Sequence, residues 1–471
     1  MLRRTKIVAT LGPATDQPGE LERVIKNGMD VARVNFSHGT SESHRQRIES
    51  VRKIAESNGR HVGIMVDLQG PKIRIKGFSK GEIELQDGAR FILDTQLESD
   101  QGTEERVGVT HKTLTEDLVG DDVLLLDDGN IVMQVEKASG HEVHCRVLNG
   151  GPLTGSKGLN RLGGGLSAEA LTEKDLADIR TAAEVEADYL AVSFVRYEED
   201  VTRARELFKA AGGRGGIISK IERAEAITNV DEIIDASDGV MIARGDLGVE
   251  IGDAELPGIQ KRFIRQARES NRVVITATQM MQSMVDNAQP TRAEVMDVAN
   301  AVMDGSDAVM LSAETAVGKH PAKVIKAMDR ICLGAERHRV PISHRVDARF
   351  ETVEESIAMA AMYTAEHLPV TAIVAMTESG ATAKWMSRNS SGIPIFAMSP
   401  NVATVRRVSL YRGVYPMLVD PTSMGTDVAE QLAIDELRRL GIVKKDDSII
   451  VTKGELTGIV GGANTMKVLK V

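Results

Sequence analysis

The chain has 471 residues, of which 42% are hydrophobic and 27% are charged, and its formal net charge is −10 at pH 7. This length exceeds a single hydrophobic core and predicts two or three domains, while the composition excludes extended disorder. The acidic balance argues against a nucleic-acid partner, because a polyanion is bound by a basic surface. The two cysteines, Cys145 and Cys332, lie far apart and predict buried free thiols.

The start of the chain gives no sign of export or of a membrane anchor. Residues 1–6 are basic, but a strand-like run follows them directly in place of the apolar core of a signal peptide. No apolar run approaches the roughly 20 residues that cross a bilayer. We therefore expect a cytoplasmic protein without a membrane partner.

Eight apolar runs of strand type recur along the first 311 residues. Helix-like stretches of ordinary crossover length separate most of them, and one long interruption separates the third run from the fourth. This pattern predicts an α/β fold, a (β/α)8 or TIM barrel with an insertion. The predicted strands are 7–11, 32–36, 62–67, 189–194, 217–222, 240–244, 273–278 and 308–311.

The interruption, residues 70–167, has a different pattern of short alternating runs. Asp128-Gly129 and Ser139-Gly140 supply turn residues between them, so the segment predicts a small β-barrel domain that acts as a lid. The glycine-rich return path at 150–165 lacks the spacing of a phosphate-binding loop and predicts a hinge. The predicted strands are 73–78, 83–85, 91–93, 123–126, 131–135 and 143–147.

A third unit follows the barrel. A helix at 353–368 and strand-like runs at 372–376, 395–398, 415–419, 448–452 and 466–471 predict a C-terminal α/β domain. The predicted organisation is a catalytic barrel at 1–69 and 168–345, a lid at 70–167 and the C-terminal domain at 346–471.

The C-terminal domain contains a candidate effector site in the turn at 377–382. Hydroxyl and backbone N–H groups of such a turn can bind a phosphate group. An ordinary capped helix start explains the same residues. The candidate residues are Thr377, Ser379, Gly380 and Thr382.

Polar residues stand at or just beyond the C-terminal ends of the predicted barrel strands. Active sites of such barrels are built on that face. The sequence therefore predicts the catalytic site there, and the residues are Arg33, Asn35, Ser37, Asp67, Lys220, Glu222, Asp246, Thr278, Ser312 and Glu314.

Four of these residues suit a reaction of a phosphorylated or enolate-like substrate. Lys220 and Glu222 are two residues apart in one strand and therefore project from the same face. Glu222 and Asp246 offer hard oxygen ligands for Mg²⁺, or for Mn²⁺ as the alternative ion. Lys220 and Arg33 can neutralise a transferring phosphoryl group or a developing enolate. A structural ion-pair network explains the same charges without catalysis.

The segments that carry these residues resemble the pyruvate kinase family. The inserted β domain and the C-terminal α/β domain also stand where the family has them. The resemblance implies phosphoryl transfer from phosphoenolpyruvate to ADP, followed by protonation of the enolate to pyruvate, the last step of glycolysis. The resembling segments are 5–13 (TKIVATLGP), 32–39 (ARVNFSHG), 67–74 (DLQGPKIR), 218–222 (ISKIE), 241–250 (MIARGDLGVE), 275–281 (ITATQMM), 290–301 (PTRAEVMDVANA) and 304–315 (DGSDAVMLSAET).

The resemblance also implies roles for individual residues. Glu222 and Asp246 would hold Mg²⁺, while Lys220 and Arg33 would contact the phosphoryl group. The rest of the substrate would be received by Gly245, Asp246 and Thr278. The residues implied for a proton relay are Ser312 and Glu314, and those implied for the nucleotide are Asn35, His38 and Arg74.

One departure from the family concerns the monovalent cation. Many members hold K⁺ with the equivalents of Asn35, Ser37, Asp67 and the Leu68 carbonyl, and those members carry Glu where this chain has Lys72. An ammonium group in that neighbourhood can replace the charge of the ion. We therefore expect activity that does not require K⁺.

Regulation and assembly follow from the resemblance as well. The C-terminal domain is closer to the members switched by AMP or sugar monophosphates than to those switched by fructose bisphosphate, which implies a phosphorylated effector. The family likewise implies a homotetramer. On the residues alone, one alternative stays open: a Mg²⁺-dependent barrel lyase or aldolase acting on pyruvate-like enolates could use the same carboxylates.

Overall fold

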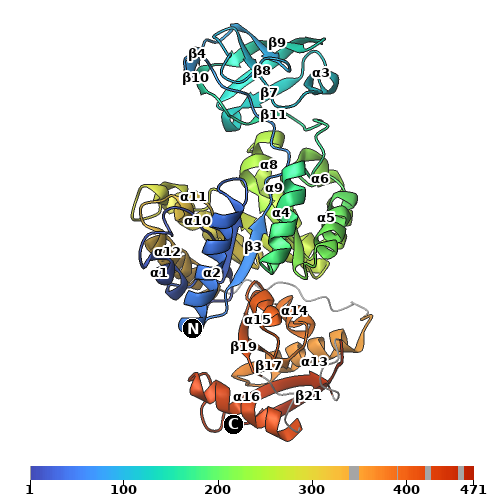
Figure 1. Ribbon diagram of the computed structural model, residues 1–471. Helices are drawn as coiled ribbons and strands as arrows, with labels where there is room; N and C mark the ends of the chain where they lie inside the picture. The colour runs from blue at the N-terminus through green and yellow to red at the C-terminus, as the bar shows by residue number, and fades with distance from the viewer. Residues whose placement is uncertain (1, 339–349, 390, 420–425, 455–460) are drawn as a thin grey trace.

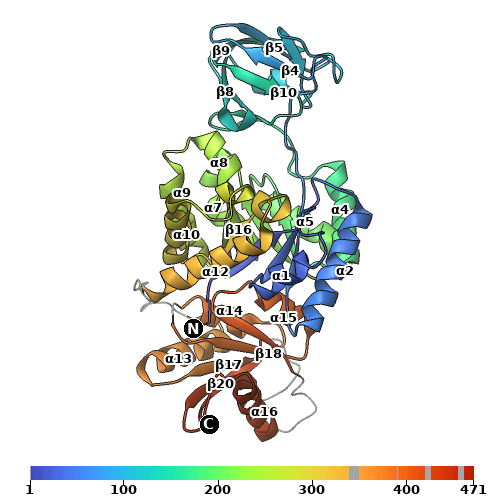
Figure 2. The ribbon, with the colours of Figure 1, turned by 90° about the vertical axis from the view of Figure 1, so that its left-hand side faces the viewer.

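The computed structural model describes residues 2–338, 350–389, 391–419, 426–454 and 461–471. It shows three units in a row, with the inserted β domain at one end, the barrel in the middle and the C-terminal domain at the other end (Figures 1 and 2). The predicted domain boundary at 345/346 lies outside the described residues.

Eight parallel strands close into a barrel in the order β1-β16-β15-β14-β13-β12-β3-β2, which confirms the predicted fold. The strands are short and apolar because a closed barrel buries both of their faces, one against the interior and one against the helices. The strands are β1 (Lys6–Thr10), β2 (Val31–Asn35), β3 (Gly63–Asp67), β12 (Tyr189–Val192), β13 (Gly216–Ile221), β14 (Gly239–Ala243), β15 (Val273–Ala277) and β16 (Ala308–Leu311).

The helices of the barrel surround these strands (Figure 2). The Thr172 and Thr291 hydroxyls accept from the N–H groups of Asp175 and Glu294, and both pairs form the capping boxes that begin α4 and α10. The helices are α1 (Glu20–Lys26), α2 (Ser41–Ser57), α4 (Glu173–Glu184), α5 (Glu198–Ala210), α6 (Ala224–Thr228), α7 (Val230–Ala236), α8 (Arg244–Ile251), α9 (Leu256–Glu269), α10 (Arg292–Asp304), α11 (Ala313–Ala316), α12 (Pro321–Arg337) and the short η2 (Gln282–Val285).

The inserted unit consists of a six-stranded sheet, β11-β7-β8-β9-β5-β6, and the pair β10-β4, which share one apolar core. The glycine-rich return path contains two of these strands, β10 and β11, which the sequence did not predict. The predicted strand 73–78 forms only isolated bridges. The elements are β4 (Glu82–Leu85), β5 (Arg90–Asp94), β6 (Arg106–Gly108), α3 (Leu114–Asp117), β7 (Val123–Leu126), η1 (Asp127–Gly129), β8 (Ile131–Ser139), β9 (Glu142–Asn149), β10 (Gly151–Thr154) and β11 (Leu159–Arg161).

The C-terminal domain is built on the sheet β19-β18-β17-β20-β21. Its strands are parallel except β21, which pairs antiparallel with β20 at the edge. This is the predicted α/β unit. Its elements are α13 (Val353–His367), β17 (Ala372–Met376), α14 (Ala381–Ser387), β18 (Ile395–Ser399), α15 (Val402–Val408), β19 (Val414–Leu418), α16 (Thr426–Arg439), β20 (Ser448–Gly454) and β21 (Ala463–Lys470).

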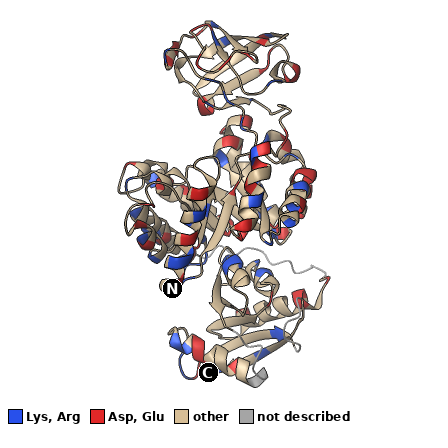
Figure 3. Cartoon of the chain, in the orientation of Figure 1, with Lys and Arg blue, Asp and Glu red and all other residues tan. Residues whose placement is uncertain are grey.

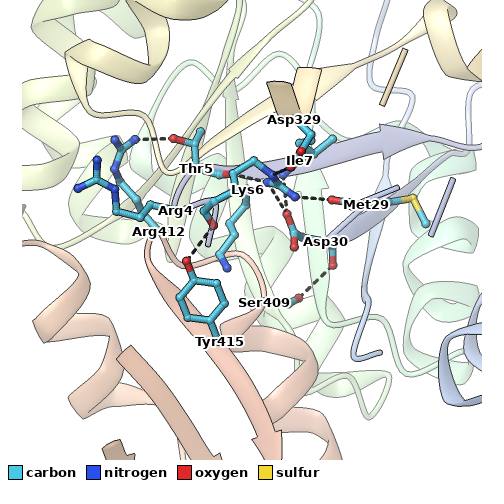
Figure 4. A network of polar contacts seen from close by, with 12 residues as sticks. Arg4, Thr5, Lys6, Ile7, Met29, Asp30, Asp329, Ser409, Arg412 and Tyr415 are labelled. Atoms are coloured by element: carbon cyan, nitrogen blue, oxygen red, sulfur yellow. Dashed lines mark hydrogen bonds and ion pairs between the residues drawn. The ribbon is translucent and has the colours of Figure 1, made fainter. Parts of the chain in front are cut away.

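The C-terminal domain packs against the N-terminal ends of the barrel strands (Figure 4). Arg412 donates to the Thr5 hydroxyl just before β1, at 2.8 Å, and the Ser409 hydroxyl donates to the Asp30 carbonyl just before β2, at 3.1 Å. That end of the barrel is therefore closed, and the C-terminal ends of the strands face the inserted domain.

Charged residues of both signs are interspersed over the outer helices of the barrel (Figure 3). In the described parts of the chain, no helix combines the length and the apolar character that crossing a membrane demands. Cys145 and Cys332 are free and buried, as predicted.

Candidate active site

Two cations meet one carboxylate at the C-terminal rim of the barrel. Arg33 lies near the end of β2 and its Nε is 2.6 Å from Asp67 Oδ2, while Lys220 Nζ on β13 is 3.3 Å from Asp67 Oδ1. Burial alone would raise the pKa of Asp67, but the attraction of Arg33 and Lys220 outweighs it and lowers that pKa. The ionised Asp67 therefore fixes both cations close together.

Lys220 is also paired with Glu222, as their two-residue spacing predicted. Its Nζ lies 2.9 Å from Glu222 Oε1. Burial disfavours the ammonium form, but attraction to Asp67 and Glu222 outweighs it and raises the pKa of Lys220 above its ordinary value. The amine is therefore charged at neutral pH and is a poor nucleophile for a Schiff base.

Glu222 follows β13 directly and is buried. Burial raises its pKa, Lys220 opposes the rise, and the nearby carboxylate of Asp246 adds to it. The net pKa lies above the ordinary value, mainly because of burial, and the negative charge of Asp246 adds a smaller repulsion. A divalent cation with oxygen ligands would relieve this repulsion, so the two residues fit Mg²⁺.

Asp246 lies in the first turn of α8, directly after β14. Its Oδ1 is 2.7 Å from the ammonium group of Lys72, which belongs to the segment leading out to the inserted domain. The preceding Gly245 donates its N–H to the Thr278 hydroxyl at 2.8 Å. The start of α8 is thus tied both to the lid segment and to the loop after β15.

Thr278 has a left-handed backbone, with φ of +66°. Arg244 holds this conformation, because its Nη2 donates to the Thr278 carbonyl at 2.7 Å and its Nη1 pairs with Asp297 at 2.7 Å. Sequence reasoning did not assign these two residues a role, although Arg244 stands inside the segment 241–250 that carried the resemblance.

Glu314 is buried between the loops that follow β15 and β16. Its carboxylate accepts the N–H of Ser312 at 2.7 Å and the N–H of Met281 at 3.1 Å. The two residues predicted for a proton relay are therefore in direct contact.

Four of the residues predicted for the monovalent cation lie at or just beyond the ends of the paired strands β2 and β3. Asn35 is opposite Asp67 in this register, and Asn35 Oδ1 accepts the Ser37 N–H at 3.1 Å. The Leu68 carbonyl accepts a hydrogen bond from the Ser193 hydroxyl at 2.7 Å. Lys72 is paired with Asp246, in the first turn of α8.

The residues predicted for the nucleotide lie on two segments. Asn35 ends β2, and His38 follows it and is exposed. Arg74 donates to the Ser156 carbonyl at 2.7 Å and bridges Gly158, so it joins the outgoing and returning segments of the inserted domain.

The predicted effector turn has internal hydrogen bonds. The Thr377 hydroxyl accepts the Gly380 N–H at 2.9 Å, and the Ser379 hydroxyl accepts the Ala381 N–H at 3.4 Å. The buried Thr382 hydroxyl donates to Glu354. A phosphate bound there would have to exchange these partners.

Comparison with known families decides the assignment. The family described as "Pyruvate kinase, barrel domain" matches residues 2–325, and the one described as "Pyruvate kinase, alpha/beta domain" matches residues 355–469. The chain belongs to the pyruvate kinase family. This membership makes it a phosphotransferase, and the alternative of a lyase or aldolase receives no support.

Similar members of the family come from several bacteria. The chain is 56% identical to "Pyruvate kinase II" of Salmonella typhimurium, with 100% of this chain and 99% of that protein covered. It is 53% identical to "Pyruvate kinase" of Haemophilus influenzae, with 96% of each covered. For "Pyruvate kinase" of Geobacillus stearothermophilus the identity is 42%, over 99% of this chain and 80% of that protein. Pyruvate kinases in general need Mg²⁺ and K⁺.

Proposed function

We propose that this chain transfers the phosphoryl group of phosphoenolpyruvate to ADP, and that the resulting enolate is protonated to pyruvate. The observation that carries the proposal is the pairing of Arg33 and Lys220 with one buried carboxylate, Asp67, beside Glu222 and Asp246 at the rim. Phosphoryl transfer is catalysed mainly by charges that are fixed before the reaction begins.

The two cations have separate tasks in this proposal. Arg33 uses Nε for Asp67 and Nη1 for the Thr10 hydroxyl, at 2.9 Å, and its guanidinium has further N–H groups for the oxygens of the phosphate. Lys220 stabilises the charge on the phosphoryl group as its bond to the enolate oxygen breaks and its bond to ADP forms.

The start of α8 binds the other end of the substrate. Asp246 presents its backbone N–H group in the first turn, where an anionic carboxylate is favoured, and Gly245 lets the backbone approach the substrate closely. The Thr278 hydroxyl, which accepts the Gly245 N–H, borders the same position.

Glu222 and Asp246 would hold Mg²⁺, or Mn²⁺, at this site. When bound, the ion supplies positive charge to the oxygens of the phosphoryl group and of the enolate. The supporting observation is the mutual repulsion of the two carboxylates, which raises the pKa of Glu222 in addition to its burial.

We assign the final proton transfer to Ser312 and Glu314. Glu314 accepts the Ser312 N–H, and this bond fixes the position of Ser312 at the end of β16. In this proposal ADP binds on the lid side of the rim, between the residues Asn35, His38 and Arg74.

We also propose that activity here does not require K⁺. The support is the Lys72 ammonium group 2.7 Å from Asp246, a fixed positive charge at the rim where K⁺-dependent relatives carry Glu. Initial rates in buffer free of K⁺ and Na⁺ test this. Full activity is expected, and a large activation by KCl would contradict it.

For regulation we propose a phosphorylated effector, AMP or a sugar monophosphate, at Thr377, Ser379, Gly380 and Thr382, acting on a homotetramer. The support for anion binding is that the turn places the hydroxyls of Thr377 and Ser379 just before α14. Adding AMP at low phosphoenolpyruvate should raise the rate of the wild type and not of Ser379→Ala. Sedimentation velocity should show a tetramer, and a monomer would contradict the assembly.

A direct test of the reaction follows pyruvate formation from phosphoenolpyruvate and ADP through lactate dehydrogenase. The wild type should be active only with a divalent ion, and Lys220→Met should lose at least about a hundredfold in kcat, the loss typical of a removed charge-stabilising donor. An active Lys220→Met variant, or a wild type that forms no pyruvate, would contradict the proposal.

A further inference from the structure

A two-residue turn after β12 contacts Lys220, in the neighbouring strand β13, and Glu222, which follows that strand directly. The Ser193 hydroxyl accepts a hydrogen bond from Lys220 Nζ at 2.8 Å. The next residue, Phe194, donates its backbone N–H to Glu222 Oε2 at 2.9 Å. One turn therefore holds the amine and the carboxylate together.

The hydroxyl of Ser193 has a fixed direction. Its own hydrogen is donated to the Leu68 carbonyl at 2.7 Å, a nearer acceptor than Asp67 Oδ1 at 3.5 Å, so a lone pair faces the ammonium group of Lys220. Ser193 is 1% exposed, so water does not compete for the hydrogen bonds of its hydroxyl, and these bonds are stronger than in solvent.

The ammonium group of Lys220 has three hydrogens and three acceptors within 3.3 Å. Two of the acceptors, Asp67 and Glu222, are carboxylates, and Ser193 is the neutral one. A third carboxylate in that place would cancel more of the positive charge that the reaction uses. A hydroxyl orients the ammonium group and leaves its charge available.

Backbone geometry holds the turn itself. Phe194 has φ of +56°, in the left-handed region, which a phenylalanine adopts only when its surroundings impose it. Gly70 packs so closely against the turn that a Cβ there would lie 2.8 Å from Ser193 Cβ. The loop after β3 therefore packs directly against Ser193 and leaves no space for a side chain at position 70.

We propose that Ser193 is a positioning residue that orients the Lys220 ammonium group for phosphoryl transfer. This inference rests on the proposed role of Lys220. Removing the hydroxyl leaves one ammonium hydrogen and the Leu68 carbonyl without their partners, so the amine can turn away from the transferring group. The rate of the bound complex should fall more than the affinity for phosphoenolpyruvate.

The test compares Ser193→Ala with Ser219→Ala. Ser219 precedes Lys220 in β13, is equally buried and bonds the Ser237 hydroxyl at 2.6 Å, so it controls for the loss of a buried hydroxyl. Ser193→Ala should lower kcat about tenfold to a hundredfold with KM for phosphoenolpyruvate within about threefold, and should move the alkaline limb of the kcat profile to lower pH. Ser219→Ala should leave that limb in place.

Equal kcat values and equal alkaline limbs in wild type and Ser193→Ala would overturn the inference, as would a loss matched by Ser219→Ala. Thermal unfolding shows whether each variant is folded. If Ser193→Ala does not fold, Ser193→Cys takes its place, because the thiol has nearly the same shape and is only a weak acceptor. The expected and contradicting results are the same for both variants. The Lys220→Met variant distinguishes a failure of the proposed function from a failure of the inference about Ser193. An active Lys220→Met contradicts the proposed function, whereas an inactive one beside a fully active Ser193→Ala contradicts only this inference.

Discussion

The ammonium group of Lys72 lies 2.7 Å from the carboxylate of Asp246, and these residues are 174 positions apart in the chain. Lys72 belongs to the segment that leads to the inserted domain, and Asp246 lies in the first turn of α8 on the barrel. Their side chains are 24% and 21% exposed, so solvent reaches the pair. A positive charge of the chain itself therefore stands beside a proposed metal ligand.

The first prediction concerns Lys72→Glu. The substitution removes the ammonium group and sets a second carboxylate beside Asp246, so kcat without K⁺ should fall at least about tenfold and KCl should restore it. Initial rates are measured with KCl and with tetramethylammonium chloride at equal ionic strength. Lys157→Glu, which breaks the 2.7 Å pair with Asp127 in the returning segment, is the control. Equal rates for wild type and Lys72→Glu without K⁺ would refute the prediction.

The second prediction concerns the proposed metal ligands. Asp246→Asn and Glu222→Gln each remove one anionic ligand, and the dissociation constant for Mn²⁺ should rise at least about tenfold, because even indirect partners of a metal typically cost that much. Binding is followed by the electron paramagnetic resonance of free Mn²⁺, without substrates. The exposed Asp253→Asn, beyond the end of α8, should bind like the wild type. Unchanged Mn²⁺ binding in both variants would show that Glu222 and Asp246 are not the metal ligands.

The third prediction concerns Gly70, whose φ is +66° and whose missing Cβ would meet Ser193 Cβ and Phe194 Cδ2 at 2.8 Å. Gly70→Ala should cost about 1–3 kcal/mol of unfolding free energy and should also lower kcat, because it displaces Ser193. Gly59 has φ of +60° with open space around it, so Gly59→Ala measures the cost of the left-handed backbone without a close contact. Urea unfolding and kcat are compared. Equal effects at both glycines would show that the close contact has no importance.

The fourth prediction concerns acid stability. His44 on α2 stacks on Phe36 with ring centroids 4.2 Å apart and is 2% exposed. Burial lowers the pKa of His44 to about 4, with the positive charges of Arg47 and Lys174 adding to the effect. Between the folded value near 4 and the ordinary value of 6.5, the unfolded state binds more protons, so stability falls as pH falls through this window.

His44→Phe keeps the stacking and removes the titration. Relative to the wild type, its unfolding free energy should gain about 2 kcal/mol between pH 7.5 and pH 5. Urea unfolding at the two pH values measures the change. His141→Phe, at an exposed position of the inserted domain, should show no such gain. A pH-independent difference between His44→Phe and the wild type would refute the assignment.

Local patterns in the sequence predicted much of this fold. Each of the eight predicted barrel strands overlaps an observed one, because buried parallel strands are apolar throughout and polar residues mark their ends. The capping boxes at Thr172 and Thr291 are equally local, since each consists of two hydrogen bonds between residues three positions apart. The strand Gly151–Thr154 was not predicted, because it is short and its glycine and proline have low β-propensity. It forms through its pairing with β4.

The sequence by itself determined that a cation and an anion stand close together at the end of one barrel strand, because residues two apart in an extended chain project to the same side. Only the tertiary structure decided their partners. Ser193 and Asp67 reach Lys220, and the Leu68 carbonyl reaches Ser193, through the pairing of β3, β12 and β13. Lys72 reaches Asp246 through the path of the inserted domain. Such contacts depend on the register of a closed barrel, a property of all its strands together that no single segment encodes.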